Sequence, residues 1–278
     1  AGGYAAALAR SAPAGCPVSR AALAFALGLA ALFAAMLALA PPGGIQVLPM
    51  SQPFLPPGAA HPFGTDDLGR DMLMAVAQGA RTSLLVGVTA LGLAVALGLA
   101  VGIAAGLGPP TMDEALMRGT DVIASLPTLL IAVLVAAFFG GSALLVALVL
   151  GLTRWTVIAR LVRVETLTLT RLPFFRAAVA LGCGPLRLAR RHVLPQLLAV
   201  VAPAAGVVFG GAILAEATLA FLGLGDPQLT SWGRLIAAGY PYLDDAWWLW
   251  AFPAAAICLT SALVALATDA LGGAGSAR

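Results

Sequence analysis

The chain has 278 residues, of which 61% are hydrophobic and only 10% are charged. A soluble domain is about half apolar and about a quarter charged, so these proportions exclude an ordinary soluble protein and indicate a polytopic membrane protein. The net charge of +3 says less than the positions of the basic residues, all fifteen of which are arginine.

The absence of lysine excludes two kinds of chemistry. A phosphate-binding loop of the G-x-x-x-x-G-K-[ST] type requires a lysine, so this chain cannot carry that ATP site. Lysine Schiff-base catalysis is excluded for the same reason. Cys16, Cys183 and Cys258 are far apart, as are the two histidines, so no zinc-binding spacing exists and we expect unpaired cysteines.

The first predicted membrane span covers residues 21–40. Residues 1–19 are rich in small residues and are expected to form a disordered N-terminal segment. Residues 21–40 then form an uninterrupted apolar run of about the 20 residues that a span needs. Because the run ends in Ala38-Leu39-Ala40, a cleaved signal peptide is the competing interpretation. Its apolar region would exceed the usual ~7–15 residues, so we favour a retained helix.

A polar interval follows, and its end predicts the start of a helix. Residues 41–60 are rich in proline and glycine, and residues 61–71 read HPFGTDDLGRD. Asp66, Asp67, Arg70 and Asp71 are expected to cap the helix and to pair locally. Acid/base catalysis or a cation site is the alternative, but no EF-hand spacing is present.

Five further spans are predicted, at residues 82–107, 122–139, 143–158, 197–214 and 247–267. The first of them contains Gly98, Gly102 and Gly106, a spacing that permits close approach of another helix. Three tryptophans, Trp247, Trp248 and Trp250, open the last span and are interpreted as an interfacial belt. The predicted fold class is therefore all-α, with six transmembrane helices and both termini on one side.

Residues 172–196 form the longest charged interval between the apolar segments. Pro173 suits the first turn of a short helix. Phe174, Ala177, Ala178 and Leu181 share one face of that helix as an apolar stripe. Residues 182–185 (GCGP) then break it, and a second basic helix is expected to stop before Pro195. A basic loop held by anionic lipid is the alternative.

The arginines predict the orientation. If the termini and residues 172–196 are cytoplasmic, twelve arginines lie on that side and three on the other. This is a clear positive-inside bias, so a plasma (inner) membrane protein with both termini cytoplasmic is predicted.

Three motifs together resemble the permease subunits of binding-protein-dependent ABC importers. Residues 176–195 resemble the cytoplasmic EAA coupling loop, with Arg176-Ala177-Ala178, then Gly182, then His192-Val193-Leu194-Pro195. Residues 61–71 and 213–225 (ILAEATLAFLGLG) resemble signatures of the dipeptide/oligopeptide/nickel branch, in its C-type subunit. Arg176 stands where the family usually has glutamate, which reverses the charge at one coupling position.

The resemblance implies a fold, partners and site residues. The fold is the type I (MetI-like) permease fold of ABC importers, and the partners are a second permease, two cytoplasmic ATPases that hold ATP and Mg²⁺, and an extracytoplasmic binding protein. The chain itself would be no enzyme and hold no cofactor. The implied ATPase-coupling residues are Pro173, Phe174, Arg176, Ala177, Ala178, Leu181, Gly182, His192, Leu194 and Pro195.

We therefore predict a subunit of the translocation path for di- or oligopeptides, with nickel, glutathione or haem as alternative cargo. Residues 1–19 would be the cytoplasmic N-terminal segment, 20–80 the first helix and an extracytoplasmic loop, 81–270 the transporter core with its coupling loop at about 161–196, and 271–278 the tail. Glu216, an acid at the end of a span, is a candidate for the path, although it could instead pair or cap structurally. An ion-coupled secondary transporter is the rival class, but it needs acids or broken helices near the midplane, whereas Asp121 and Glu216 lie near span ends.

Overall fold

The computed structural model describes residues 51–276, and the side chains of residues 51–272. The described part is helical and contains no β-strand. The long helices are α3 (Met72–Leu107), α4 (Pro110–Ser125), α5 (Thr128–Phe139), α6 (Ala143–Thr170), α9 (Leu194–Phe221) and α11 (Trp248–Ser276). The short ones are α7 (Pro173–Ala180), α8 (Pro185–Leu188) and α10 (Trp232–Gly239), with a π-helical turn, η2, at Ala189–Val193 and a 3₁₀ turn, η3, at Tyr240–Tyr242. The predicted helix at 21–40 and the segment 1–19 lie outside the described residues.

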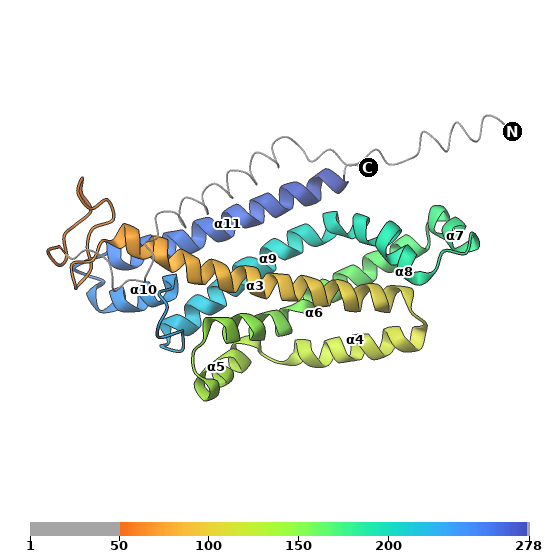
Figure 1. The fold of residues 1–278 in the computed structure, drawn as a ribbon, viewed down its shortest axis with the longest axis horizontal. Coiled ribbons are helices and arrows are strands. Elements are labelled where there is room, and N and C mark those ends of the chain that lie inside the picture. Colours follow the sequence, from red (N-terminus) through yellow and green to blue (C-terminus); the bar gives the residue numbers. More distant parts are fainter. Residues whose placement is uncertain (1–50, 277–278) are drawn as a thin grey trace.

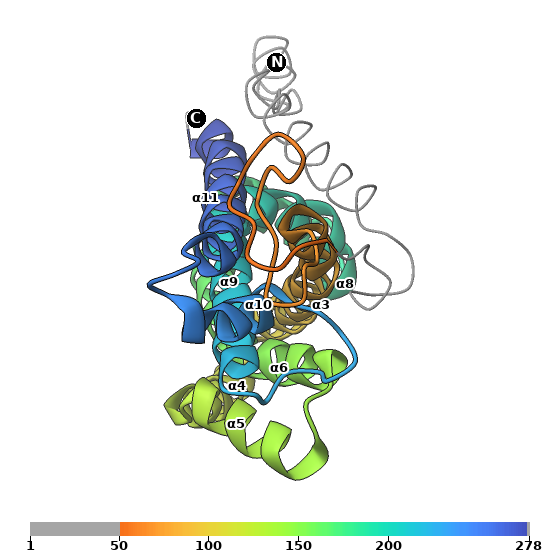
Figure 2. The same cartoon turned by 90° about the vertical axis from the view of Figure 1, so that its left-hand side faces the viewer.

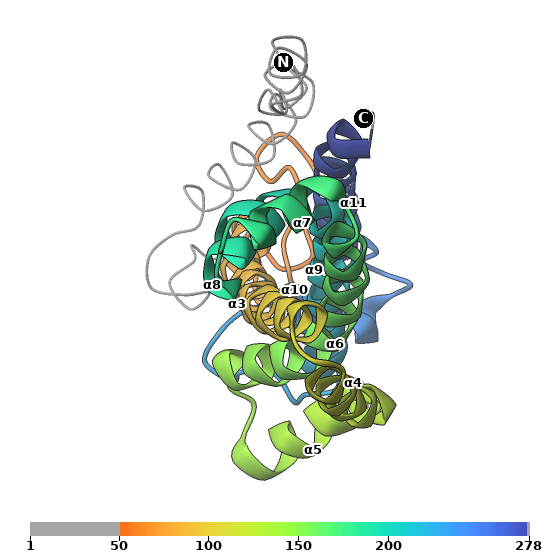
Figure 3. The same ribbon diagram turned by 90° about the vertical axis from the view of Figure 1, so that its right-hand side faces the viewer.

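The helices α3, α6, α9 and α11 run lengthwise beside one another, and α4 follows the same direction (Figure 1). The loop of residues 51–71 and helix α10 lie at one end, here called the α10 end, which faces the viewer in Figure 2. Helices α7 and α8 lie at the opposite end, here called the α7 end, as Figure 3 shows. The molecule is thus an elongated helical bundle with a distinct small structure at each end.

Within the described residues, four continuous helices are long and apolar enough to cross a membrane: Met72–Leu107, Ala143–Thr170, Pro185–Phe221 and Trp248–Gly272. Helices α4 and α5 qualify only as a pair, and they are bent by 70° at the break between them. The predicted straight span at 122–139 is therefore wrong. Leu126 is extended because the ring of Pro127 disfavours a helical residue before it and removes an N–H donor.

The three spaced glycines of α3 do provide a close helix contact, and their partner is α6. A Cβ atom placed on Gly98, Gly102 or Gly106 would lie 2.6 Å from side-chain atoms of Ile158, Val162 and Thr166, respectively. The two backbones are thus too close to admit any side chain. Because lipid offers no hydrophobic driving force, such dense packing is what holds spans together.

The polar start of α3 folds largely as predicted. Asp71 caps the helix by accepting hydrogen bonds from the backbone N–H groups of Leu73 (2.9 Å) and Met74 (3.2 Å). Asp66 and Arg70 form an ion pair, with 2.6 Å between Oδ2 and Nε. These contacts confirm the local capping and pairing.

The tryptophans at the start of α11 differ from the predicted belt. Trp248 is buried, and its indole N–H donates to the backbone oxygen of Thr65 at 3.0 Å. Trp247 and Trp250 are exposed. Only these two remain available to an interface, while Trp248 anchors the 51–71 loop to the bundle.

The second basic helix continues where it was predicted to stop. Helix α8, the η2 turn and α9 form one span from Pro185 to Phe221. At their junction the N–H of Leu194 donates to the oxygen of Ala189, five residues earlier, which is the π-helical pattern. Pro195 then falls in the first turn of α9, where a missing N–H is tolerated.

Candidate functional site

Helix α7 is attached to the bundle by one face. Pro173 begins it, and Phe175 and Ala178 turn inward, with exposed fractions of 5% and 8%. They join an apolar cluster that includes Leu188 and Val193 of the following basic segment. Helix α7 is therefore packed against both α6 and the start of the long helix that leads into α9.

The outward side of the α7 end is apolar at its centre. Phe174, Leu181 and Leu186 are 42%, 85% and 68% exposed. The predicted stripe of four residues is thus divided, because Phe174, Ala177 and Leu181 are exposed while Ala178 faces the protein. The ring of His192 lies 6.3 Å from that of Phe174, which brings the two ends of the predicted motif together. We call Phe174, Ala177, Leu181 and Leu186 the α7-end apolar patch.

Gly182 ends α7 with a defined turn. Its N–H donates to the oxygen of Val179 at 2.9 Å, and the N–H of Cys183 donates to the oxygen of Ala178 at 3.1 Å. These two bonds form a Schellman motif, which needs a left-handed residue at the position of Gly182, where φ is +80°. Glycine is required here for its backbone angle, since a Cβ atom would meet nothing within 4 Å.

The segment that carries the apolar patch also contains five arginines, and the interval 171–196 contains no acidic residue. All five are exposed: Arg171, Arg176, Arg187, Arg190 and Arg191. Of the remaining predicted coupling residues, Pro195 is exposed and Leu194 is half-buried. The α7 end therefore combines an apolar centre with a positive rim.

Glu216 lies at the other end of the bundle, inside the protein. Its side chain is 5% exposed, and its Oε2 accepts a hydrogen bond from the hydroxyl of Ser83 in α3 at 3.0 Å. The Ser83 oxygen in turn accepts from the backbone N–H of Trp232 in α10 at 3.3 Å. This carboxylate therefore joins α9 to α3 and, through Ser83, to α10.

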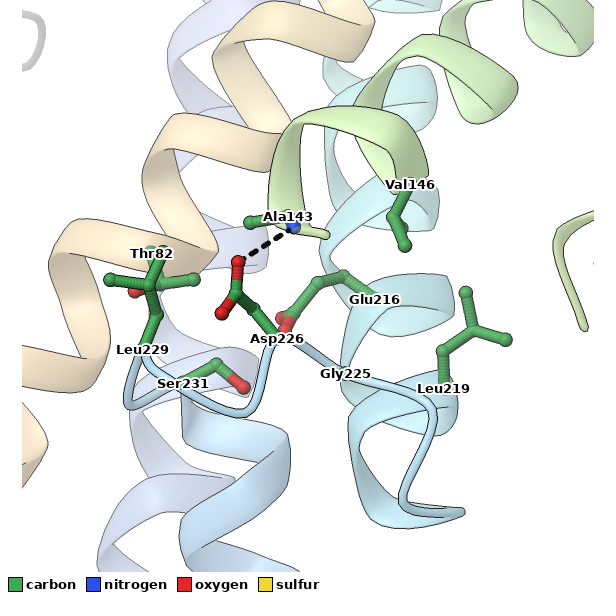
Figure 4. A pocket seen from close by; sticks show the side chains of 9 residues that line it. All are labelled: Thr82, Ala143, Val146, Glu216, Leu219, Gly225, Asp226, Leu229 and Ser231. Atoms are coloured by element: carbon green, nitrogen blue, oxygen red, sulfur yellow. Dashed lines mark hydrogen bonds between the residues drawn. The ribbon is translucent and has the colours of Figure 1, made fainter. Parts of the chain in front are cut away.

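A small pocket adjoins Glu216 (Figure 4). The lining residues come from α3, α6, α9 and the loop before α10, and they are Thr82, Ala143, Val146, Glu216, Leu219, Gly225, Asp226, Leu229 and Ser231. Asp226 accepts a hydrogen bond from the backbone N–H of Ala143 at 3.3 Å, which satisfies a donor at the start of α6. The surroundings of Glu216 are thus a hydrogen-bonded helix junction.

The predicted coupling residues and Glu216 do not form one site. Leu194 and Glu216 lie on one helix, 22 residues apart, which corresponds to about 33 Å along its axis. Two residues were not predicted from sequence: Ser83, which binds Glu216, and Phe175, which attaches α7 to the bundle. Ser83 could have been noticed as a polar residue in an apolar span, whereas Phe175 could not be told from Phe174 by composition.

The fold and the motifs can be compared with known proteins. The family model described as "Binding-protein-dependent transport system inner membrane component" matches residues 98–274. The oligopeptide transport system permease protein OppC of Escherichia coli (strain K12) is 38% identical over 203 residues, covering 73% of this chain and 67% of the relative. OppC of Haemophilus influenzae is 36% identical over 201 residues, with coverage of 72% and 65%.

Two further comparisons agree. The E. coli protein named "Probable D,D-dipeptide transport system permease protein DdpC" is 34% identical over 231 residues, covering 83% of this chain and 76% of the relative. A chain in a structure of inward-facing conformations of the MetNI methionine ABC transporter has a TM-score of 0.61 at 17% identity, covering 74% of this chain and 98% of that one. This likeness confirms the predicted all-α permease fold. The chain belongs to the family of binding-protein-dependent transport system inner membrane components.

Proposed function

We propose that this chain is one of two permease subunits of an ABC importer that moves peptides across the inner membrane. The names of its relatives support a peptide cargo. Its partners are a second permease, an extracytoplasmic binding protein and two cytoplasmic ATPases that hold ATP and Mg²⁺. Because the chain lacks lysine, ATP hydrolysis belongs to those partners.

The α7 end is the proposed ATPase-docking surface and lies in the cytoplasm. The five exposed arginines there follow the positive-inside rule. An exposed apolar patch with a polar rim is typical of a protein contact, and a short helix inserted in a groove is one of the recurring modes of such contacts.

One observation carries the coupling role. Helix α7 is packed through Phe175 and Ala178 onto the first turns of a helix that runs without interruption from Pro185 to Phe221. A displacement of α7 by the ATPase would therefore be passed to one helical segment about 55 Å long, which contains the π-helical turn at Ala189–Val193 and Pro203. Its far end carries Glu216 and the pocket beneath α10.

The test is a pair of leucine variants in the assembled transporter. Leu181→Asp places a charge in the α7-end apolar patch at a side chain that is 85% exposed, so the fold should tolerate it. We expect ATP-dependent peptide uptake and ATPase copurification to fall at least tenfold.

Leu266→Ala, at a residue of α11 that is 58% exposed, serves as the control and should leave both quantities unchanged. Retention of the ATPases and of uptake in Leu181→Asp would exclude the docking role. The cargo is tested separately, by identifying the ligands that copurify with the cognate binding protein.

A further inference from the structure

One arginine lies deep within a span. Helix α6 begins at Ala143 and continues to Thr170, beyond the expected end at residue 158. Arg154 follows Ala143 by 11 residues, which places it about 16 Å along the helix. The hydrocarbon layer of a bilayer is about 30 Å thick, so a span counted from Ala143 reaches Arg154 about halfway across. On this count Arg154 is a mid-span residue, whereas the arginine tally places it at the cytoplasmic end.

The guanidinium of Arg154 lies beside Gly211 of α9. A Cβ atom on Gly211 would be 3.2 Å from Nη1, 3.5 Å from Cζ and 3.7 Å from Nη2 of the guanidinium. The preceding residue, Gly210, faces α11, where its Cβ position lies 3.6 Å from the hydroxyl of Ser261. Arg154 of α6 and Ser261 of α11 thus lie beside two successive glycines of α9.

The guanidinium has no counter-ion among the residues that the structure describes. All twelve acidic residues lie between positions 66 and 269, inside the described part, and none forms an ion pair with Arg154. Its Nε is buried and has no hydrogen-bond acceptor among residues 51–276. By contrast, Arg160 and Arg163, further along α6, are paired with Asp121 and Asp113 of α4.

The surface around Arg154 is open. Residues of α9 on the same face as Gly211 are exposed, with Val207 at 70% and Leu214 at 61%. A charge at this depth is costly against lipid but not against water, and such residues mark ion and substrate pathways. This face of α6 and α9 therefore borders an aqueous space or an anionic partner.

We propose that Arg154 lines the translocation path and binds a carboxylate of the passing peptide. This inference rests on the proposed function and adds a specific contact to it. Planar guanidinium groups recognise carboxylates through two parallel hydrogen bonds, and no acidic side chain among the described residues forms an ion pair with Arg154. A single contact of this kind holds the cargo only transiently, as passage requires.

The transport test uses the complete transporter with its binding protein in proteoliposomes. We expect Arg154→Gln to lower the number of peptides imported per ATP hydrolysed about tenfold, while assembly and ATPase stimulation by the loaded binding protein persist. Arg154→Lys keeps the charge and should recover a large part of the transport. Equal transport by wild type and Arg154→Gln would overturn the proposal. Failure of Arg154→Gln to assemble would also overturn it, because Arg154 would then be an anchor for the second permease.

The second test measures access directly. Arg154→Cys is made in a chain whose three native cysteines are replaced by serine, and it is treated with the membrane-impermeant anion 2-sulfonatoethyl methanethiosulfonate. We expect labelling in the assembled transporter and slower labelling when peptide-loaded binding protein and ATP are present. Absence of labelling would place residue 154 outside the path. If wild type imports no peptide at all, the proposed cargo fails, whereas labelling of the cysteine still reports on the path.

Discussion

Ser83 of α3 donates a hydrogen bond to Glu216 of α9 across 133 residues of sequence, with 3.0 Å between the two oxygens. Both side chains are buried, so the Ser83 hydroxyl supplies a hydrogen bond that the carboxylate would otherwise receive from water. The path role expected for Glu216 stays a prediction, and its surroundings favour a junction that fixes the α10 end.

Ser83→Ala should lower the free energy of unfolding by about 1–3 kcal/mol, because it removes one of the hydrogen-bond donors of a buried carboxylate, the other being Ser231. Glu216→Gln keeps an acceptor for the Ser83 hydroxyl and should lower the free energy of unfolding by less than Ser83→Ala does. Thermal unfolding in detergent measures both. A smaller loss for Ser83→Ala than for Glu216→Gln would contradict the structural role.

The close packing of α3 and α6 predicts a strong position dependence among the glycines of α3. Gly102→Val adds a side chain where even a Cβ atom would lie only 2.6 Å from Val162. This substitution should lower the free energy of unfolding by about 1–3 kcal/mol or prevent folding. Gly92 has nothing within 4 Å of its Cβ position, so Gly92→Val on the same helix is the control. Expression and unfolding temperature of the two variants distinguish packing from a general intolerance to valine.

The turn after α7 predicts a graded response at position 182. Gly182→Val forces a β-branched residue into φ +80° and should cost about 1–2 kcal/mol locally, which disorders α7. Gly182→Asn tolerates that angle better and should retain more function. ATP-dependent uptake by the assembled transporter should therefore follow the order glycine, asparagine, valine. Equal uptake by all three would mean that the α7 turn is irrelevant to coupling.

The hydrogen bond from Trp248 to Thr65 is expected to hold the 51–71 loop on the bundle. Trp248→Phe keeps an aromatic ring in the core but removes the donor to Thr65. It should lower the free energy of unfolding by about 0.5–1.5 kcal/mol. The loop should then exchange its amide hydrogens faster. Trp250→Phe, at a residue that is 37% exposed, is the matched control. Unchanged hydrogen exchange of residues 51–71 in Trp248→Phe would exclude the anchor.

Local features were predictable from sequence because each depends on residues close together in the chain. Composition and apolar runs identified a polytopic membrane protein, Asp71 was expected at a helix start, and Gly182 was expected to end a short helix after Pro173. The resemblance carried by residues 61–71, 176–195 and 213–225 led to the family, which the comparisons confirmed. These inferences need only helix periodicity, capping chemistry and the length of a membrane span.

Other features were decided by tertiary structure, because they depend on which faces meet. The sequence pattern predicts a helix end before Pro195, yet the helix continues through the π-helical turn at Ala189–Val193 and past this proline. The tryptophan cluster predicts an interfacial position for Trp248, but Trp248 is buried and hydrogen-bonded to the loop of residues 51–71. The arginine tally predicts a cytoplasmic position for Arg154, and only the full length of α6 and the position of Arg154 beside Gly211 led to the proposal that it lines the path. Sequence alone determined that apolar helices span a membrane, whereas the depth and partners of each polar side chain follow from packing between segments far apart in the chain.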